Sequence, residues 1–266
     1  MLLLTGASGA LGSLIARKLS HHPHTRTGTR TPTPNQRKID LDAPHTLDLS
    51  SVKTLLLISA GYGEDDTVIA RHEAAIGAAE RAGVRHIVYT SLTAEGDHLP
   101  YALAHRWTER RLRDSPLAWT VLRNGLYAEL LAALAAPGPD GRITAPLGTG
   151  TVAAVAREDL ADIAVRVALD PTPHTGRTYE LVGDRAIGGA DLAAATGTTY
   201  TPTTLAAART ALSGPGSVPF QIPMLIGTYS AIAADFLSTP DQGPLHTLLQ
   251  NPPRDALKTY AAALSL

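Results

Sequence analysis

The sequence TGASGALG, residues 5–12, lies between a short apolar run at residues 1–4 and a segment with apolar residues at helical spacing, residues 10–19. This order predicts a strand, a glycine-rich turn and a helix. Gly6 would allow the sharp turn, Gly9 would let the backbone approach a pyrophosphate, and Gly12 would let the helix pack against the strand. The free N–H groups and the positive dipole end of the helix would face the phosphates. The residues that we assign to this dinucleotide site are Gly6, Ser8, Gly9, Ala10, Leu11 and Gly12, and the alternative is a turn with only a structural role.

Strands and helices alternate through the first half of the chain. Continuous apolar runs at residues 53–59 and 85–91 are typical of strands covered on both faces. Further strands are expected at 24–30, just before Asp40, at 119–122 and at 177–181, and helices at 67–82, 103–112 and 157–169. Between Arg30 and Ile39, two prolines and a short span predict a tight loop in place of a crossover helix. The alternation predicts an α/β fold with a Rossmann-type doubly wound parallel sheet.

A smaller C-terminal α+β lobe is expected beyond the sheet. We place an NAD(P)-binding Rossmann core at residues 1–125 and a substrate-binding lobe at residues 126–266, with segments near 143–181 returning to the sheet. Glycine and proline clusters separate the short helices expected in the lobe. These helices are predicted at residues 190–196, 204–212, 224–237 and 255–264.

Composition narrows the classes of partner. The net charge of the 266 residues is −1, and the scattered Lys and Arg give no general attraction to nucleic acid. There is no cysteine, no signal peptide pattern at the first residues, and no apolar run near the roughly 20 residues that a membrane span needs. His21, His22 and His24 have no acidic partner nearby, so we expect them to be solvated and not metal ligands. We therefore expect a cytoplasmic protein that acts on a small molecule, without metal, nucleic acid or membrane as partners, and we leave a homodimer open.

The end of the second expected strand favours NADPH as the cofactor. An acidic residue there binds the ribose 2′-hydroxyl of NAD, whereas a basic residue accepts the 2′-phosphate of NADP. No Asp or Glu occurs between Thr5 and Lys38, but Arg26, Arg30 and Arg37 do. A guanidinium suits a phosphate through its forked donors. We therefore predict NADPH preference with Arg30 as the phosphate ligand, and the alternative for Arg30 is a solvated side chain.

Small or polar residues follow the later strands of the predicted sheet. Ligands bind at the carboxyl ends of parallel strands in such sheets, so residues at these ends are expected to line the cofactor. Asp40 and Leu41, after the third strand, would flank the adenine. The residues that we assign to the ends of the fourth and fifth strands are Ser59, Ala60, Gly61, Thr90, Ser91 and Leu92.

Four stretches together resemble the NmrA-like atypical short-chain dehydrogenase/reductases: TGASGALG, HIVYTSL, TERRLRDSPLAWTVLRNGLYAE and ITAPLGTGTVAAVAREDLA. The likeness runs from Met1 to about Leu181 and is closest to the bacterial NAD(P)H:quinone oxidoreductases of that family. It implies a Rossmann core that binds NADPH and a C-terminal lobe that closes over the substrate. It also places the nicotinamide and substrate beside Asn124, Gly125 and Tyr127, and the alternative for Tyr127 is a packed core aromatic. The family includes redox sensors that bind the dinucleotide without turning it over.

The catalytic pattern of this family is altered here. Short-chain reductases usually take a proton from Tyr-x-x-x-Lys, in which the lysine lowers the pKa of the tyrosine. This chain has Tyr101-Ala-Leu-Ala-His105, so histidine replaces lysine. Tyr101 and His105 are one helical turn apart and would share a face. We predict that they are the catalytic residues, with a protonated His105 as donor, and the alternative is an exposed histidine at a helix start.

The favoured function is an NADPH-dependent oxidoreductase that transfers hydride to a quinone or a related conjugated carbonyl, without flavin or metal. A quinone accepts hydride readily, so positioning and a modest hydrogen-bond donor would suffice. Two alternatives stay open. One is a non-catalytic NADP(H)-sensing regulatory protein, and the other is a biosynthetic enzyme of the same fold with altered chemistry.

Overall fold

The computed structural model describes residues 1–34, 36–240 and 243–265. Internal contacts divide the chain into two compact units. The first unit comprises Met1–Leu92, Leu103–Arg123 and Leu160–Tyr179, and the second comprises Thr93–Ala102, Asn124–Asp159 and Glu180–Leu266. This division differs from a single boundary near residue 125, because the chain passes between the units several times.

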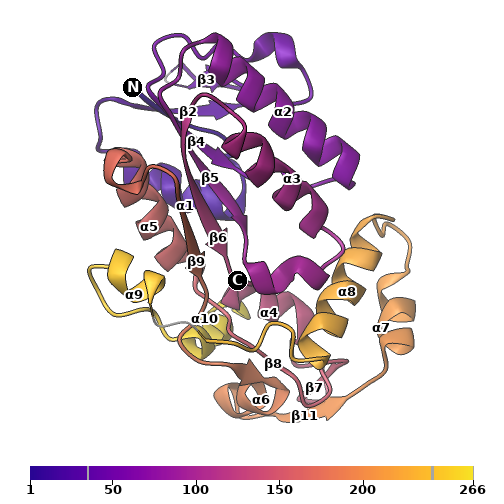
Figure 1. Ribbon diagram of the computed structural model, residues 1–266. Coiled ribbons are helices and arrows are strands. Elements are labelled where there is room, and N and C mark those ends of the chain that lie inside the picture. Colours follow the sequence, from indigo (N-terminus) through magenta and orange to yellow (C-terminus); the bar gives the residue numbers. More distant parts are fainter. Residues whose placement is uncertain (35, 241–242, 266) are drawn as a thin grey trace. The chain divides into compact units, whose positions relative to one another are not determined.

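A seven-stranded sheet has the order β3-β2-β1-β4-β5-β6-β9 (Figure 1). The strands are β1 Leu2–Leu4, β2 Thr25–Thr29, β3 Arg37–Lys38, β4 Thr54–Ile58, β5 His86–Leu92, β6 Ala118–Asn124 and β9 Arg177–Leu181. The pairs from β3 to β5 are all parallel. The predicted Rossmann-type doubly wound sheet is therefore confirmed. The strand order reverses between β1 and β4, where sheets of this kind bind their ligands.

Helices cover both faces of the sheet (Figure 1). One face carries α1 Ala10–Leu19 and α5 Arg157–Leu169, and the other carries α2 Asp65–Arg81 and α3 Ala102–Arg113. Between β2 and β3 the described residues form no helix, as the two prolines predict. The core between α2 and the sheet is built from Leu55, Leu57, Ile76 and Ile87, all without solvent exposure. The central strands are continuous apolar runs because both of their faces are covered.

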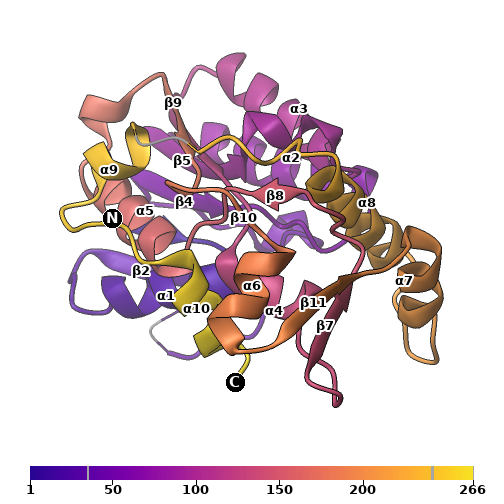
Figure 2. The same cartoon turned by 90° about the horizontal axis from the view of Figure 1, so that it is seen from below.

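The second unit holds most of the remaining helices and two small strand pairs (Figure 2). Its helices are α4 Ala128–Leu134, α6 Gly189–Thr196, α7 Leu205–Leu212, α8 Gln221–Ala233, α9 Pro244–Leu248 and α10 Ala256–Ala263. Strand β7 Arg142–Ala145 pairs with β11 Thr199–Pro202, and β8 Thr151–Val152 pairs with β10 Ile187–Gly188. The helix expected to end at residue 237 stops at Ala233, since Asp235 has a left-handed φ of 59°. None of the helices in the described residues is both long and apolar enough to cross a bilayer.

Candidate functional site

The turn between β1 and α1 needs glycine for two geometric reasons. Gly6 has a φ of 65°, in the left-handed region that favours glycine, and its carbonyl accepts a 3.0 Å hydrogen bond from the Gly9 N–H. A Cβ on Gly12 would lie 2.0 Å from the Gly6 oxygen, so helix α1 can approach the turn only without a side chain there. Helix α1 has no side-chain N-cap and no acidic residue in its first turn. Its first N–H groups are thus free to bind an anion.

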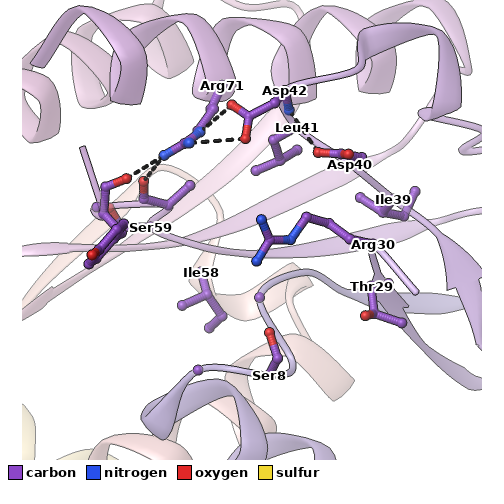
Figure 3. Close-up of a pocket in the computed structure, with 16 residues that line it drawn as sticks. Ser8, Thr29, Arg30, Ile39, Asp40, Leu41, Asp42, Ile58, Ser59 and Arg71 are labelled. Atoms are coloured by element: carbon purple, nitrogen blue, oxygen red, sulfur yellow. Dashed lines mark hydrogen bonds and ion pairs between the residues drawn. The ribbon is translucent and has the colours of Figure 1, made fainter. Parts of the chain in front are cut away.

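A cavity of about 340 Å³ in the first unit lies at the carboxyl ends of β1, β2, β3 and β4. Figure 3 shows the side chains that surround it. The predicted cofactor residues that line it are Gly6, Ser8, Gly9, Arg30, Asp40, Leu41, Ser59, Ala60 and Gly61. The predicted residues of α1 and β5 outside this lining are Ala10, Leu11, Gly12, Thr90, Ser91 and Leu92. The structure therefore gathers residues from four strand ends that are far apart in the sequence.

Several cavity residues were missed by the sequence analysis. They are Gly28, Thr29, Ile39, Asp42, Ile58, Tyr62 and Arg71. Gly28 had a signal, because a glycine inside a strand often marks a close approach. A Cβ at Gly28 would lie 2.6 Å from Ile39 Cγ1. Arg71 and Asp42 carried no signal in the sequence, because their ion pair depends on how α2 packs on the sheet.

Arg71 on α2 joins two loops at the cavity. Its Nε donates to Asp42 Oδ1 at 2.6 Å and its Nη2 donates to Asp42 Oδ2 at 3.0 Å. Its Nη1 donates to the Tyr62 carbonyl at 2.6 Å. The hydrogen bond from Arg71 lowers the pKa of Asp42 from its usual value. The loop after β3 and the loop after β4 are therefore tied to the same guanidinium.

His72, the next residue along α2, binds the loop after β4. Its Nε2 accepts a 2.9 Å hydrogen bond from the Ala60 N–H, and its Nδ1 lies 2.8 Å from Thr108 Oγ1. Thr108 in turn donates to the Ala104 carbonyl at 2.7 Å. Burial lowers the pKa of His72 to about 3, so the ring is neutral and Nδ1 carries its proton. This buried network holds the Ala60 backbone in place beside the cavity.

His105 lies on α3 with its Nδ1 2.9 Å from the hydroxyl of the buried Tyr89. Burial lowers the pKa of His105 to about 4. The expectation of a protonated His105 is therefore wrong for the resting protein at neutral pH, because burial disfavours the charged ring. If Tyr89 donates to Nδ1, the proton of the neutral ring is on Nε2.

Tyr101 stands just before α3 and is not part of the helix. Its hydroxyl lies 3.2 Å from Thr228 Oγ1, and Thr228 donates to the Met224 carbonyl at 2.9 Å, so Tyr101 is the donor to Thr228. Burial raises the pKa of Tyr101. The hydroxyl is thus engaged within the second unit and is not a ready acid.

The residues at the carboxyl end of β5 form hydrogen bonds to neighbouring elements. Thr90 Oγ1 accepts a 3.0 Å hydrogen bond from the Ser59 N–H, which fixes a residue of the cavity. Ser91 donates to Glu109 Oε1 at 2.7 Å, and that carboxylate is fully buried and also bonded to Arg123. The Ser91 hydroxyl therefore donates its proton to a residue of α3. Leu92 uses its carbonyl to accept from Arg106 Nη1 at 2.9 Å.

Asn124, Gly125 and Tyr127 belong to the second unit. Asn124 is buried, and its backbone carbonyl accepts a 2.9 Å hydrogen bond from the Thr93 N–H. The Arg157 guanidinium lies over the Tyr127 ring at 4.9 Å from its centroid. Burial raises the pKa of the Tyr127 hydroxyl. A Cβ on Gly125 would come within 3.2 Å of Val182 Cα, so glycine there permits close backbone packing.

The residues at the cavity fit NADPH. The glycine turn and the uncapped end of α1 offer backbone donors to a pyrophosphate. Arg30 makes no hydrogen bond or ion pair within the described residues, and Figure 3 shows its guanidinium projecting into the cavity. Ser59, at the end of β4, lines the same cavity and carries a hydroxyl. Such groups suit a phosphorylated nucleotide, whose oxygens would accept their hydrogen bonds.

Comparisons with known proteins point to the same cofactor. A model of a family described as NAD(P)H-binding matches residues 6–171. Quinone oxidoreductase 2 of Escherichia coli is 35% identical over 203 residues, which cover 70% of each chain. An NAD(P)H azoreductase of Xenophilus azovorans is 27% identical over 260 residues, covering 90% of this chain and 89% of the relative. The crystal structure of the Escherichia coli quinone oxidoreductase QOR2 complexed with NADPH superposes with a TM-score of 0.87 at 29% identity, over 98% of this chain and 99% of that one.

Proposed function

The chain belongs to the NAD(P)H-binding family, and from that premise we propose that it reduces a quinone or a related conjugated carbonyl. It is an NADPH-dependent oxidoreductase of the quinone oxidoreductase and azoreductase type. When bound, NADPH would supply a hydride, and a quinone that takes up this hydride and one proton becomes its hydroquinone. The chain's own residues have to hold the cofactor, place the acceptor and offer a hydrogen bond to its oxygen.

The single observation that carries the proposal is the cavity beside the glycine turn. Its floor is the turn at Gly6 and Gly9, and Arg30 extends over it without an ion pair in the described residues. No carboxylate lies at the end of β2, where an acidic residue would bind the ribose 2′-hydroxyl of NAD. We assign the pyrophosphate to the turn and the 2′-phosphate to Arg30.

The acceptor requires little acid catalysis. The hydroquinone oxygen is weakly basic, so a neutral donor suffices to orient and stabilise it. A neutral His105 with its proton on Nε2 is such a donor, and its Nδ1 would be held by Tyr89. Asn124 and Tyr127 are proposed to contact the substrate through an amide and a flat ring.

A second candidate function is NADP(H) sensing without turnover. It is favoured by the state of the two predicted catalytic residues. Tyr101 has its hydroxyl bonded to Thr228, and His105 is neutral, so neither supplies a ready proton. A sensor would keep the nucleotide site and need no acid.

The test is a comparison of Arg30→Ala with Arg26→Ala. Arg26 lies on the same strand, and its guanidinium bonds the Thr25 carbonyl at 2.8 Å outside the cavity. Loss of a charged hydrogen bond from Arg30 is expected to weaken NADPH binding about 10- to 100-fold, with NADH and the Arg26 variant nearly unchanged. Calorimetry gives the dissociation constants, and the absorbance of the reduced nicotinamide gives turnover on quinones and azo dyes. An Arg30→Ala variant that binds NADPH as tightly as wild type would contradict the phosphate assignment. Tight NADPH binding by wild type without turnover on any acceptor would favour the sensor.

A further inference from the structure

We propose that Arg71 determines the preference for NADPH by neutralising Asp42, which would otherwise repel the 2′-phosphate and attract Arg30. The inference rests on the proposed NADPH site and adds a specificity residue to it. All three side chains line the same cavity, and each comes from a different element: Arg30 from the end of β2, Asp42 from the loop after β3, and Arg71 from α2.

Asp42 and Arg71 form an ion pair with defined geometry. Two parallel hydrogen bonds of 2.6 and 3.0 Å join the carboxylate to the guanidinium. The Asp42 N–H also donates to Asp40 Oδ1 at 3.1 Å, which steadies the loop that carries it. Such fork-to-fork pairs fix geometry as well as charge. Asp42 is therefore held facing α2.

Most of the N–H donors of Arg71 are already engaged by protein acceptors, in contrast to those of Arg30. Besides Asp42 it donates from Nη1 to the carbonyls of Tyr62 at 2.6 Å and Ala60 at 3.4 Å. Figure 3 shows the hydrogen bonds of Arg71 ending on Asp42 and on the backbone of the loop after β4. Arg71 acts through Asp42, as a positioning residue.

Arg30 and Asp42 are close enough to influence each other. The charge of Arg30 contributes to the lowered pKa of Asp42, behind the larger effect of the Arg71 hydrogen bond. Yet Arg30 forms no ion pair with any described residue, and its guanidinium stays over the cavity. Without Arg71, the Asp42 carboxylate would lose its partner and compete with a phosphate for Arg30.

The proposal makes an ordered prediction for four proteins. The summed charge of Arg30, Asp42 and Arg71 is +1 in wild type, 0 in Arg71→Gln, +2 in Asp42→Asn and +1 in the double variant. The ratio of NADH to NADPH dissociation constants should follow this sum. We expect Arg71→Gln to lower the ratio about five- to tenfold, Asp42→Asn to raise it, and the double variant to return near wild type.

The measurement is titration of each purified protein with NADPH and with NADH by calorimetry, together with a thermal-shift scan for folding. Loosening of the loops alone would weaken both coenzymes equally, and the double variant would then show no rescue. Arg81→Gln, at the exposed end of α2, is the control and should leave the ratio unchanged. If Arg71→Gln does not fold, Asp42→Asn still decides, since a lowered or unchanged ratio overturns the inference. Wild type without NADPH preference would instead contradict the proposed function.

Discussion

At the scale of single residues, burial decides what the histidines can do. His72 and His105 have pKa values of about 3 and about 4, in both cases because burial disfavours the charged ring. His72 uses both ring nitrogens: Nε2 accepts from the Ala60 N–H, and Nδ1 bonds Thr108 Oγ1. His105 uses Nδ1 with Tyr89 and is only partly buried, so Nε2 is the atom with which it would meet a ligand.

Replacement of His105 tests this assignment. His105→Ala should lower turnover on a quinone about five- to tenfold, the value of one neutral hydrogen bond, with NADPH affinity nearly unchanged. Because the pKa of His105 is about 4, wild-type turnover should not fall as pH rises from 6 to 8 through this group. Steady-state kinetics across pH measures both effects, with His45→Ala, an exposed position, as the control. Unchanged turnover in His105→Ala would remove this residue from the mechanism.

At the scale of elements, glycine is required in helix α1 but not in helix α2. Gly12 in α1 lies against the Gly6 carbonyl, whereas a Cβ on Gly77 in α2 would meet only the ends of flexible side chains, the nearest being Arg81 Nη1 at 3.3 Å. The first glycine is needed by the approach of α1 to the turn. The second is a helix position where glycine costs stability.

A pair of alanine substitutions separates the two roles. Gly12→Ala should push α1 away from the turn, destabilise the protein by about 1–3 kcal/mol and abolish tight NADPH binding. Gly77→Ala should stabilise the protein by about 0.5–1 kcal/mol and leave NADPH binding unchanged. Denaturant unfolding and coenzyme titration measure these effects. Tight NADPH binding by a folded Gly12→Ala protein would show that the close approach is dispensable.

At the scale of the whole molecule, buried neutral histidines make the free energy of unfolding depend on pH. His72 is without solvent exposure and His86 is 4% exposed, and burial lowers the pKa of His86 to about 4. The unfolded chain binds protons at these rings near pH 6.5, and the folded chain binds them only near pH 3 to 4. Between these limits the unfolded state binds more protons, so the free energy of unfolding falls as the pH falls.

The acid dependence is measurable against matched variants. Each buried ring should contribute about 1.4 kcal/mol of lost stability per pH unit below pH 6.5, down to about pH 4 for His86. Replacement of both rings, His72→Gln with His86→Gln, should flatten the dependence relative to wild type over this range. Urea unfolding at a series of pH values gives the slopes. Equal slopes in the two proteins would refute the depressed pKa values.

Local pattern was enough to predict the parallel sheet, the glycine turn and the position of Arg30. These features depend on residues adjacent in the chain: apolar runs form strands, glycines permit the turn, and Arg30 ends a strand whatever else packs around it. The apolar periodicity also located α1 and α5 with the bounds found in the structure, Ala10–Leu19 and Arg157–Leu169. Short-range physics therefore determined the elements and the glycine-lined edge of the sheet.

The tertiary structure alone decided which distant side chains meet there. Asp42 and Arg71 are 29 residues apart, and their pairing depends on how α2 packs on the sheet. Likewise, no sequence pattern revealed that His72 would bind the Ala60 N–H or that burial would keep His105 neutral. Packing sets both the partners and the dielectric environment of such groups, and neither is encoded by neighbours in the sequence.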